Sequence, residues 1–412
     1  MAKVKIGVFG AGRGMTAINQ LFENQDAELV AVCDKYKPLL DKCKAEAEKH
    51  GLTNIAFYED FDEFFKHDMD AVMLANYAHE HAKYAIKFLR SGRHVMTECL
   101  TMANMAEAVE LIEAVEQSGK VYCYSENYCY APARWEMREL YRKGVIGELM
   151  YAEGEYIHDC SSIWPSITYG QRDHWRNQNS AVFYCTHSIG PIIHMTGLRP
   201  VQVVAFETQS MPFMRDLGMP AGCAGMEIVT LENGAILKSV HGNLKSYKHH
   251  YNYQLNGTLG CLQDLGGGEI GVYVEQPGQN CRGERKNYSP APVIAGSETS
   301  GHDGSDFYTM YYFIRTILGD ETARERSIDV YEAVDMCMPG TLGYRSILAG
   351  NAPIRLPNLR NPAEREQYRH DTFCTFKGTA GDMYVPSNVK DPYIPDEVYA
   401  KVKEMWEKGI PG

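Results

Sequence analysis

The sequence lacks the features of several large classes of protein. It has no run of about 18 consecutive apolar residues, the length that a helix needs to cross a bilayer, and its start shows no signal-peptide cleavage pattern. Lysine and arginine number 41 against 53 acidic residues, so the positive excess that binds nucleic acid or anionic lipid is missing. We therefore expect a cytoplasmic protein with neither nucleic-acid nor membrane partners.

The cysteines lack an organised pattern. Twelve of them are scattered through apolar segments, without CxxC pairs or the Cys/His spacing of a zinc site. We expect reduced, mostly buried thiols and no metal centre.

What the sequence contains is the alternation typical of an α/β protein. In the first 125 residues, short β-type runs alternate with amphipathic helical segments, which predicts a doubly wound parallel sheet. Later β-type runs, such as 149–158 and 235–241, are separated by Asn-Gly or Gly turns, which favours a mostly antiparallel, open-faced sheet. The predicted fold is an α/β Rossmann domain followed by an α+β domain.

The change of pattern along the chain predicts three segments. Residues 1–128 form the dinucleotide-binding domain, 129–352 form a substrate-binding and oligomerisation domain, and 353–412 form an extended tail that packs on the body or on a partner subunit. We expect the open sheet face to be apolar and to be buried in a homo-oligomer.

A glycine cluster stands where the first predicted strand turns into the first helix. Gly10, Gly12 and Gly14 lie there with Arg13, and glycines at such a turn let the backbone approach a pyrophosphate at the helix N-terminus. The dinucleotide-binding pattern would place its third small residue at position 15, where the chain has Met15. Gly14 is therefore expected to provide the close packing.

Asp34 ends the second predicted strand. Its carboxylate can accept hydrogen bonds from a ribose 2′-hydroxyl and repels a 2′-phosphate, which predicts NAD as the cofactor. Lys35 and Lys37 keep NADP as an alternative.

The run SGRHVMTE at 91–98, with His81 before it, resembles the Gfo/Idh/MocA family of NAD(P)-dependent oxidoreductases. In that family such a run ends in Glu-Lys-Pro, and the Lys lies by the nicotinamide and helps to move a proton. Here Glu98 is followed by Cys99 and Leu100. The simplest reading of Cys99 is a packed thiol that fills the position of the Lys.

A second departure surrounds His187. Sugar dehydrogenases of the family usually carry Asp four residues before this His and three after it, where the chain has Phe183 and Gly190. The same absences mark the NAD-dependent glycosidases of the family, exemplified by α-N-acetylgalactosaminidase. The residues that match their pattern are Glu126-Asn127, Cys129-Tyr130, Arg142 to Gly144, Gly147 to Leu149, Tyr156, His158-Asp159, Trp175-Arg176, Thr186-His187, Gly190-Pro191, Gly301-His302, Gly304 and Asp306.

The resemblance implies a redox-neutral hydrolysis. NAD⁺ would take a hydride from C3 of a sugar, a base would remove the acidified C2 proton, the C1 substituent would leave, water would add, and the hydride would return. Tyr156 would act near C2 and His187 at the C3 hydroxyl. The implied cofactor contacts, beyond Gly10 to Gly14 and Asp34, are Asn76, His81, Glu98, Cys99, Glu126 and Asn127. The implied substrate contacts are Arg176, Tyr184, Thr186 and His302.

Two other functions stay open. One is a net sugar or inositol dehydrogenase, or a 3-ketoglycoside-forming oxidoreductase, that releases NADH; His187 alone could dispose of the hydroxyl proton. The other is a non-catalytic nucleotide-sensing protein, for which Cys99, Phe183 and Gly190 are signs of lost chemistry.

Overall fold

The fold consists of two units. Unit 1 comprises Met1–Ala131 and Pro292–Val334, and unit 2 comprises Pro132–Ala291 and Asp335–Gly412. The chain thus crosses between the units more than once, which differs from the three consecutive segments expected from the sequence. The computed structural model describes residues 2–246, 250–276, 282–294, 297, 300–302 and 304–411.

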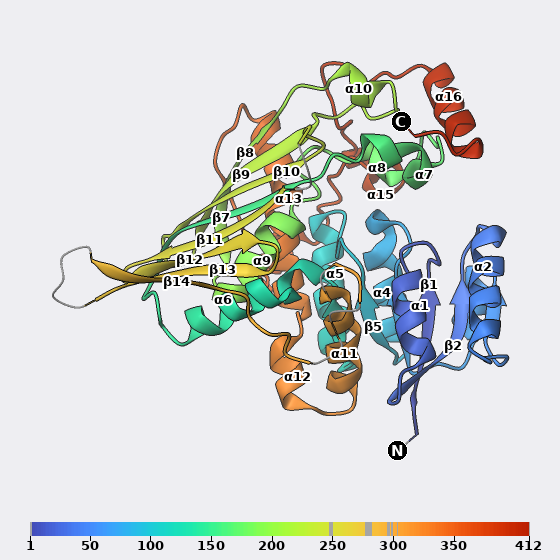
Figure 1. Cartoon of the computed structure of the whole chain (residues 1–412). Helices are drawn as coiled ribbons and strands as arrows, with labels where there is room; N and C mark the ends of the chain where they lie inside the picture. The colour runs from blue at the N-terminus through green and yellow to red at the C-terminus, as the bar shows by residue number, and fades with distance from the viewer. Residues whose placement is uncertain are drawn as a thin grey trace. The chain divides into compact units, whose positions relative to one another are not determined.

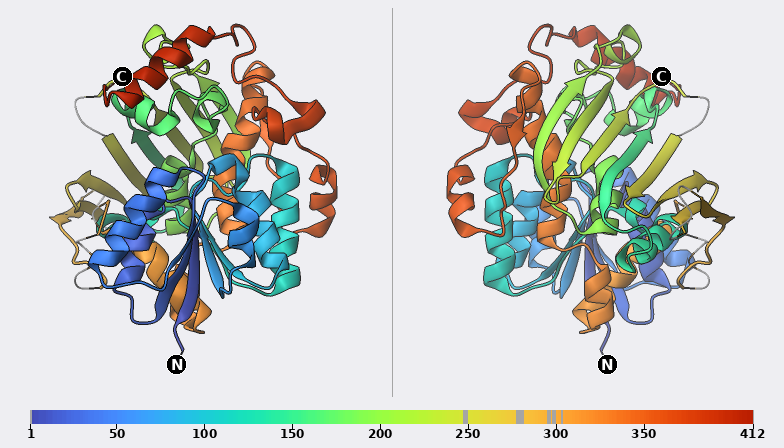
Figure 2. Two further views of the ribbon diagram at one scale, coloured as in Figure 1. Left: turned by 90° about the vertical axis from the view of Figure 1, so that its right-hand side faces the viewer. Right: turned by 90° about the vertical axis from the view of Figure 1, so that its left-hand side faces the viewer.

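Unit 1 is built on a six-stranded parallel sheet in the order β3-β2-β1-β4-β5-β6. The central strands are continuous apolar runs because helices cover both faces of the sheet (Figure 2). The strand order reverses between β1 and β4, and ligands of such folds bind at the carboxyl ends of the strands near that point. The strands are β1 Val4–Phe9, β2 Ala27–Cys33, β3 Ala56–Tyr58, β4 Ala71–Leu74, β5 His94–Thr97 and β6 Tyr122–Tyr124.

The helices of unit 1 begin and end where the sequence provides caps. In α5, the Asn104 side chain accepts a hydrogen bond from Glu107 N, and Gly119 closes the helix in the left-handed conformation. The helices are α1 Met15–Phe22, α2 Lys37–Lys49, α3 Phe61–Lys66, α4 His81–Arg90, α5 Met105–Ser118, α11 Ser305–Ile317 and α12 Glu321–Arg326, with 3₁₀ turns η1 Ala78–Glu80 and η2 Asn127–Tyr130.

Helix α11 explains why a late part of the chain belongs to unit 1. Its buried Met310, Phe313 and Ile314 join the apolar cluster formed by β1, β2 and α1, which includes Ile6 and Ile18. Burying three such side chains stabilises the docking of α11 by several kcal/mol, at about 1.5–3 kcal/mol each.

Unit 2 is built on a nine-stranded sheet in the order β14-β13-β12-β11-β7-β10-β9-β8-β15. The pair β7–β10 is parallel and the other pairs are antiparallel, as predicted. Three of its strands, β12, β14 and β15, were not expected from the sequence. The strands are β7 Leu149–Ile157, β8 Pro200–Glu207, β9 Ala224–Leu231, β10 Ile236–Gly242, β11 His250–Gly257, β12 Gly260–Gly266, β13 Glu269–Glu275, β14 Gly283–Tyr288 and β15 Ile354–Arg355.

One face of this sheet is covered by helices, chiefly α9 (Thr186–Thr196) and α6 (Pro132–Arg142). Helix α9 lies so close to β7 that a Cβ on Gly154 would stand 1.8 Å from Ser188 O, so this position admits only glycine. Helix α13 (Val330–Leu348) runs from unit 1 into unit 2.

The other face of the sheet is open, as predicted (Figure 2, right), but it is not uniformly apolar. Lys238 of β10 forms ion pairs of 3.0 Å with both Glu153 and Glu155 of β7. The exposed Phe206 and Met226 lie on the β8–β9 side of that pair. The prediction of an apolar open face is therefore wrong at the centre of the sheet, which is charged because Lys238 is in register with Glu153. Only the β8–β9 side of the face is apolar.

The chain after Pro353 packs against the rest of unit 2. The ring of Phe376 lies 4.9 Å from that of Phe183, and Tyr399 in α16 donates a hydrogen bond of 2.9 Å to Gly218 O. The helices of this segment are α14 Pro362–Arg365, α15 Lys377–Ala380 and α16 Asp396–Glu407, with the 3₁₀ turns η5 Glu366–Tyr368 and η6 Gly381–Met383. The short helices earlier in unit 2 are α7 Trp164–Thr168, α8 Trp175–Gln178 and α10 Pro212–Arg215, with the 3₁₀ turn η3 Ser161–Ile163.

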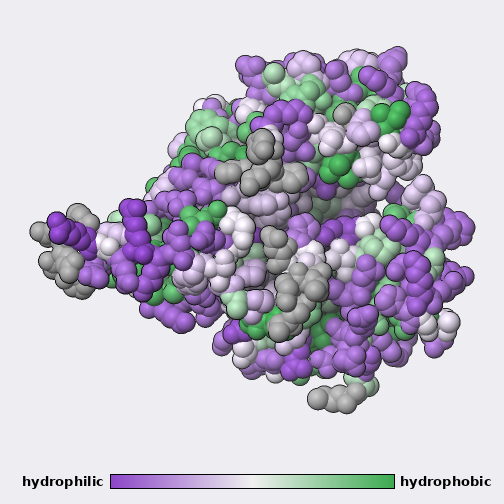
Figure 3. All heavy atoms as spheres, in the orientation of Figure 1, coloured by the Kyte–Doolittle hydropathy of each residue, from purple (hydrophilic) through white to green (hydrophobic). Residues whose placement is uncertain are grey.

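The surface around α1 and α2 is mostly hydrophilic. Hydrophilic residues cover most of the face around α1 and α2 in Figures 1 and 3, as the lysines and glutamates of α2 require. Over the described ranges, no helix combines the length and apolar character that crossing a membrane needs. None of the described cysteines forms a disulfide, as expected.

Candidate functional site

The glycines of the loop in unit 1 have two different roles, since some allow close packing and one leaves space for a ligand. A Cβ on Gly14 would stand 2.1 Å from Gly10 O, and one on Gly10, whose φ is 98°, would stand 2.4 Å from the Ala75 backbone. Gly10 thus lets the loop lie against the chain that follows β4, and Gly14 lets α1 begin against the loop itself, which agrees with the packing role expected for Gly14. A Cβ on Gly12 would meet only Leu39 Cδ1, at 3.9 Å. The space beside Gly12 is thus left open at the N-terminus of α1.

Asp34 and Asn76 flank this loop from the ends of β2 and β4. Asp34 accepts hydrogen bonds from Ala11 N at 2.7 Å and Tyr36 N at 2.8 Å, which hold its carboxylate beside the loop. Both polar atoms of the Asn76 amide are buried, and the described residues offer them no hydrogen-bond partner. A buried amide without partners indicates a missing polar ligand at this edge.

These observations fit a dinucleotide. A pyrophosphate fits the open space at Gly12 and the N-terminus of α1, and a ribose hydroxyl fits the carboxylate of Asp34. Asn76 supplies further donors and acceptors at the point where the strand order reverses.

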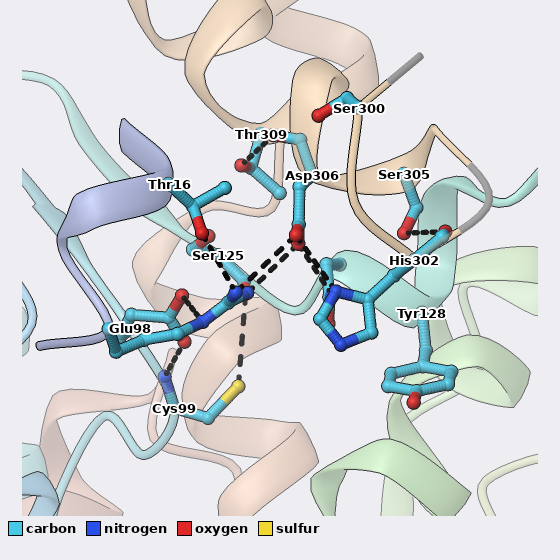
Figure 4. Close-up of polar contacts among 12 residues, drawn as sticks. Thr16, Glu98, Cys99, Ser125, Tyr128, Ser300, His302, Ser305, Asp306 and Thr309 are labelled. Atoms are coloured by element: carbon cyan, nitrogen blue, oxygen red, sulfur yellow. Dashed lines mark hydrogen bonds and ion pairs between the residues drawn. The ribbon is translucent and has the colours of Figure 1, made fainter. Parts of the chain in front are cut away.

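A charged network lies behind the loop (Figure 4). Arg13 donates to Glu98 at 2.8 Å and to Asp306 at 2.9 Å. Asp306 also accepts from Asn127 Nδ2 at 2.7 Å and from His302 Nδ1 at 2.8 Å. Burial alone would raise the pKa of Asp306, but its hydrogen bonds to His302 and Arg13 hold that pKa well below the ordinary value. Asp306 is therefore a buried carboxylate that ties four segments of unit 1 together.

His81 does not face an open site. It is fully buried, and its ring nitrogens lie 2.8 Å from Leu100 O and 3.2 Å from Asn76 O. Burial lowers its pKa to about 4, so the ring is neutral at physiological pH. His81 therefore holds the backbone of Asn76 and Leu100 in place, and its contact with the cofactor stays a prediction.

Cys99 and Glu126 are packed together. The Cys99 thiol lies 3.3 Å from Glu126 Oε2 and is buried, as a thiol that fills a vacated position would be. Glu126 is fully buried and also accepts a hydrogen bond from Tyr128 N at 3.3 Å.

Unit 2 contains a pocket of about 180 Å³ at the carboxyl end of β7. Tyr156, Arg176 and Tyr184 all line it, so the structure brings together three residues that the sequence analysis assigned to catalysis and substrate binding. Trp164 and Met219, from an apolar cluster of unit 2, close its far side. The pocket combines aromatic walls with a few polar groups, which is typical of a small-molecule site.

His187 lies beside Tyr156 at the start of α9. The two ring centroids are 4.6 Å apart, and the ring of Tyr184 packs edge-on to His187 at 5.0 Å. Tyr253 donates a hydrogen bond of 2.5 Å to His187 O, which fixes the first turn of α9 on the sheet. The phenol and the imidazole are therefore neighbours held by two different elements.

The other predicted substrate contacts differ from one another. Arg176 stacks on Trp175, with its guanidinium carbon 4.2 Å from the ring centroid. Thr186 is fully buried, away from the pocket, because α9 enters the core at that point. His302 belongs to unit 1, where it contacts Asp306 and lies 6.0 Å from the Tyr128 ring. Thr186 is thus part of the core in this structure, whereas the His302 side chain is 44% exposed and its contact with substrate stays a prediction.

The sequence analysis left Asp306 out of the site, although Gly301-His302 with Gly304 and Asp306 belonged to the pattern it matched. That spacing places the carboxylate one helical turn after His302, within hydrogen-bond reach. It also left out His241, whose strand carries no motif.

Residues 4–126 match the family model described as oxidoreductase family, NAD-binding Rossmann fold. The resemblance to the Gfo/Idh/MocA oxidoreductases is confirmed. The first unit thus has an NAD-binding Rossmann fold, as the glycine loop and Asp34 predicted.

Relatives extend the match over most of the chain. A glycosyl hydrolase family 109 protein of Saccharopolyspora erythraea is 24% identical over 387 residues, which cover 86% of this chain and 83% of the relative. Among solved structures, the fold is similar to myo-inositol 2-dehydrogenase from Lactobacillus plantarum, with a TM-score of 0.67 and 16% identity over 86% of this chain and 100% of that one. It is also similar to a levoglucosan dehydrogenase in complex with NADH and L-sorbose, with a TM-score of 0.69 and 17% identity over 87% and 100%.

Proposed function

We propose that this protein is an NAD-dependent enzyme that hydrolyses a glycoside through transient oxidation at C3 of the sugar. The observation that carries the proposal is the pairing of Tyr156 with His187 beside a pocket lined by Arg176 and Tyr184. The name of the curated relative supports the hydrolysis, and the names of the two solved structures support a sugar-like substrate.

The residues of unit 1 hold the cofactor. Gly12 and the N-terminus of α1 bind the pyrophosphate, and Asp34 binds the ribose hydroxyls. Bound NAD supplies the acceptor, and later the donor, of the hydride at C3. Because Asp34 would repel a 2′-phosphate, NAD is the proposed cofactor over NADP.

The residues of unit 2 move the protons. His187 takes the proton of the C3 hydroxyl as that carbon is oxidised, and returns it when the ketone is reduced. The ketone acidifies the C2 hydrogen, which Tyr156 removes. Arg176 donates hydrogen bonds to sugar oxygens, and the edge of Tyr184 keeps the His187 ring in place.

The substitutions at three positions favour hydrolysis over net oxidation. Cys99 is packed against Glu126, and Phe183 is packed against Phe376, so neither offers the polar group that sugar dehydrogenases of the family carry there. Gly190 lies inside α9 and is buried. A cycle that returns the hydride needs no group to send the hydroxyl proton to solvent.

The test follows absorbance at 340 nm while a panel of methyl and p-nitrophenyl glycosides is turned over by protein loaded with NAD. We expect release of the alcohol with no growth of absorbance over many turnovers. Continuous growth of absorbance with an intact glycosidic bond would identify a net dehydrogenase instead.

A further inference from the structure

His241 shares the pocket with Tyr156 but has no part in the mechanism above. It lies at the end of β10, in register with Tyr156 on the neighbouring strand β7, and it lines the pocket. Its Nε2 lies 2.9 Å from Glu227 Oε1 on β9. Among the described residues, His241 Nδ1 has no hydrogen-bond partner, so this nitrogen is left for the pocket.

Glu227 is a fully buried carboxylate. Its second oxygen accepts a hydrogen bond of 2.5 Å from Ser239 Oγ, which lies 2.8 Å from Ser188 Oγ in α9. No Lys or Arg of the described chain pairs with it, and His241 is its ion-pairing neighbour. The hydrogen bond to the carboxylate fixes the orientation of the His241 ring.

The strand order places His241 on a definite side of Tyr156. The sheet runs β11-β7-β10-β9, and Tyr253 of β11 holds the backbone of His187. The backbone of His187 is thus held by a side chain from the β11 side of Tyr156, and His241 lies on the β10 side. If His187 acts at C3 of the sugar and Tyr156 acts at C2, then His241, the next side chain across the sheet, is the one beside C1. This carbon carries the leaving group.

We infer that His241 is the general acid and base at C1, positioned by Glu227; this inference rests on the proposed function. In the elimination, the C2–H bond breaks, its electron pair forms the C1–C2 double bond, the C1–O bond breaks, and the leaving oxygen takes the proton of His241 Nδ1. In the addition, water bonds to C1, its proton returns to Nδ1, and C2 takes a proton back from Tyr156. His241 is a catalytic residue in this scheme, and Glu227 is a positioning residue.

The test compares two leaving groups on whichever sugar the wild-type protein hydrolyses. A methoxide must be protonated to leave, whereas p-nitrophenolate leaves without a proton. His241→Gln, which keeps a donor toward Glu227, should lower kcat/KM for the methyl glycoside by about a hundredfold or more and for the p-nitrophenyl glycoside by less than about tenfold. Glu227→Gln should shift the same ratio in the same direction, and Glu153→Gln, on the open face of the same sheet, should leave it unchanged.

Several outcomes would overturn the inference. If kcat/KM falls equally for both leaving groups, so that their ratio does not change, His241 and Glu227 support the fold or bind the sugar instead. NAD affinity and thermal unfolding, measured for each variant, identify a variant that fails to fold. Ser239→Ala, which removes one hydrogen bond to Glu227 together with the contact to Ser188 Oγ, then takes its place and should change the ratio by about threefold. A wild-type protein that hydrolyses no glycoside would refute the proposed function itself.

Discussion

The charged network of unit 1 and the pocket of unit 2 use polar groups in opposite ways. In the network, Asp306 accepts hydrogen bonds from Arg13, Asn127 and His302, so its charge is satisfied within the protein. In the pocket, the Arg176 guanidinium stacks on aromatic rings and pairs with no carboxylate in the described chain. The network therefore maintains the shape of the cofactor loop, whereas the Arg176 guanidinium of the pocket has no carboxylate partner among the described residues.

Removing a group that the proposed mechanism assigns to proton transfer should lower activity far more than cofactor affinity. His187→Ala should lower kcat by about a thousandfold, because general acid–base groups contribute about 10²–10⁴-fold. NAD affinity, measured by calorimetry, should stay within about twofold of wild type. An unchanged kcat would remove His187 from catalysis and favour the nucleotide-sensing alternative.

Removing a satisfied group should cost stability instead. Asp306→Asn should lower the free energy of unfolding by about 3 kcal/mol, because it leaves Arg13 and His302 without their buried partner. Denaturant unfolding measures the effect, and Asp41→Asn, in an exposed ion pair, should change stability by less than about 0.5 kcal/mol.

The pH dependence of the same carboxylate follows from its lowered pKa. Its contribution to stability is fully present above the ordinary Asp pKa and is lost as pH falls through the lower folded value. Wild type should therefore lose stability relative to Asp306→Asn only below about pH 4. A difference between them that is constant from pH 7 down to pH 3 would contradict this assignment.

The two glycines of the loop separate packing from binding within unit 1. Gly14→Ala should destabilise the fold by about 1–3 kcal/mol, because its Cβ would overlap Gly10 O. Gly12→Ala should leave the unfolding of the cofactor-free protein within about 0.5 kcal/mol and weaken NAD binding by about tenfold. Equal NAD affinity in the Gly12 variant would mean that the pyrophosphate lies elsewhere.

The smallest expected effect concerns cofactor choice. Asp34→Asn removes the charge that repels a 2′-phosphate, so the ratio of NAD to NADP affinity should fall by about tenfold, equivalent to ~1.4 kcal/mol. Titration of both nucleotides by protein fluorescence measures the ratio. A ratio that does not change would leave Lys35 and Lys37 as the determinants of specificity.

The features that the sequence predicted well are local ones. The close packing of Gly14 follows from a few consecutive residues and their backbone requirements. The parallel sheet follows from apolar runs separated by helices, because strands buried on both faces need such runs.

The features that it did not predict depend on pairings between distant segments. Asp306 meets Arg13 only because the apolar side chains of α11 dock on α1, far away in the chain. The charged centre of the open face depends on the register that sets Lys238 opposite Glu153. His241 reaches Tyr156 for the same reason, and neither strand alone carries a signal of that register.

Turnover of a glycoside in D₂O, with the released sugar examined by NMR, tests the proposed chemistry most directly. The account predicts deuterium at C2 of the sugar, because Tyr156 removes that hydrogen and a solvent-derived one returns. It also predicts that protein stripped of NAD releases no sugar until NAD is restored. Release without deuterium at C2, from protein free of NAD, would contradict it.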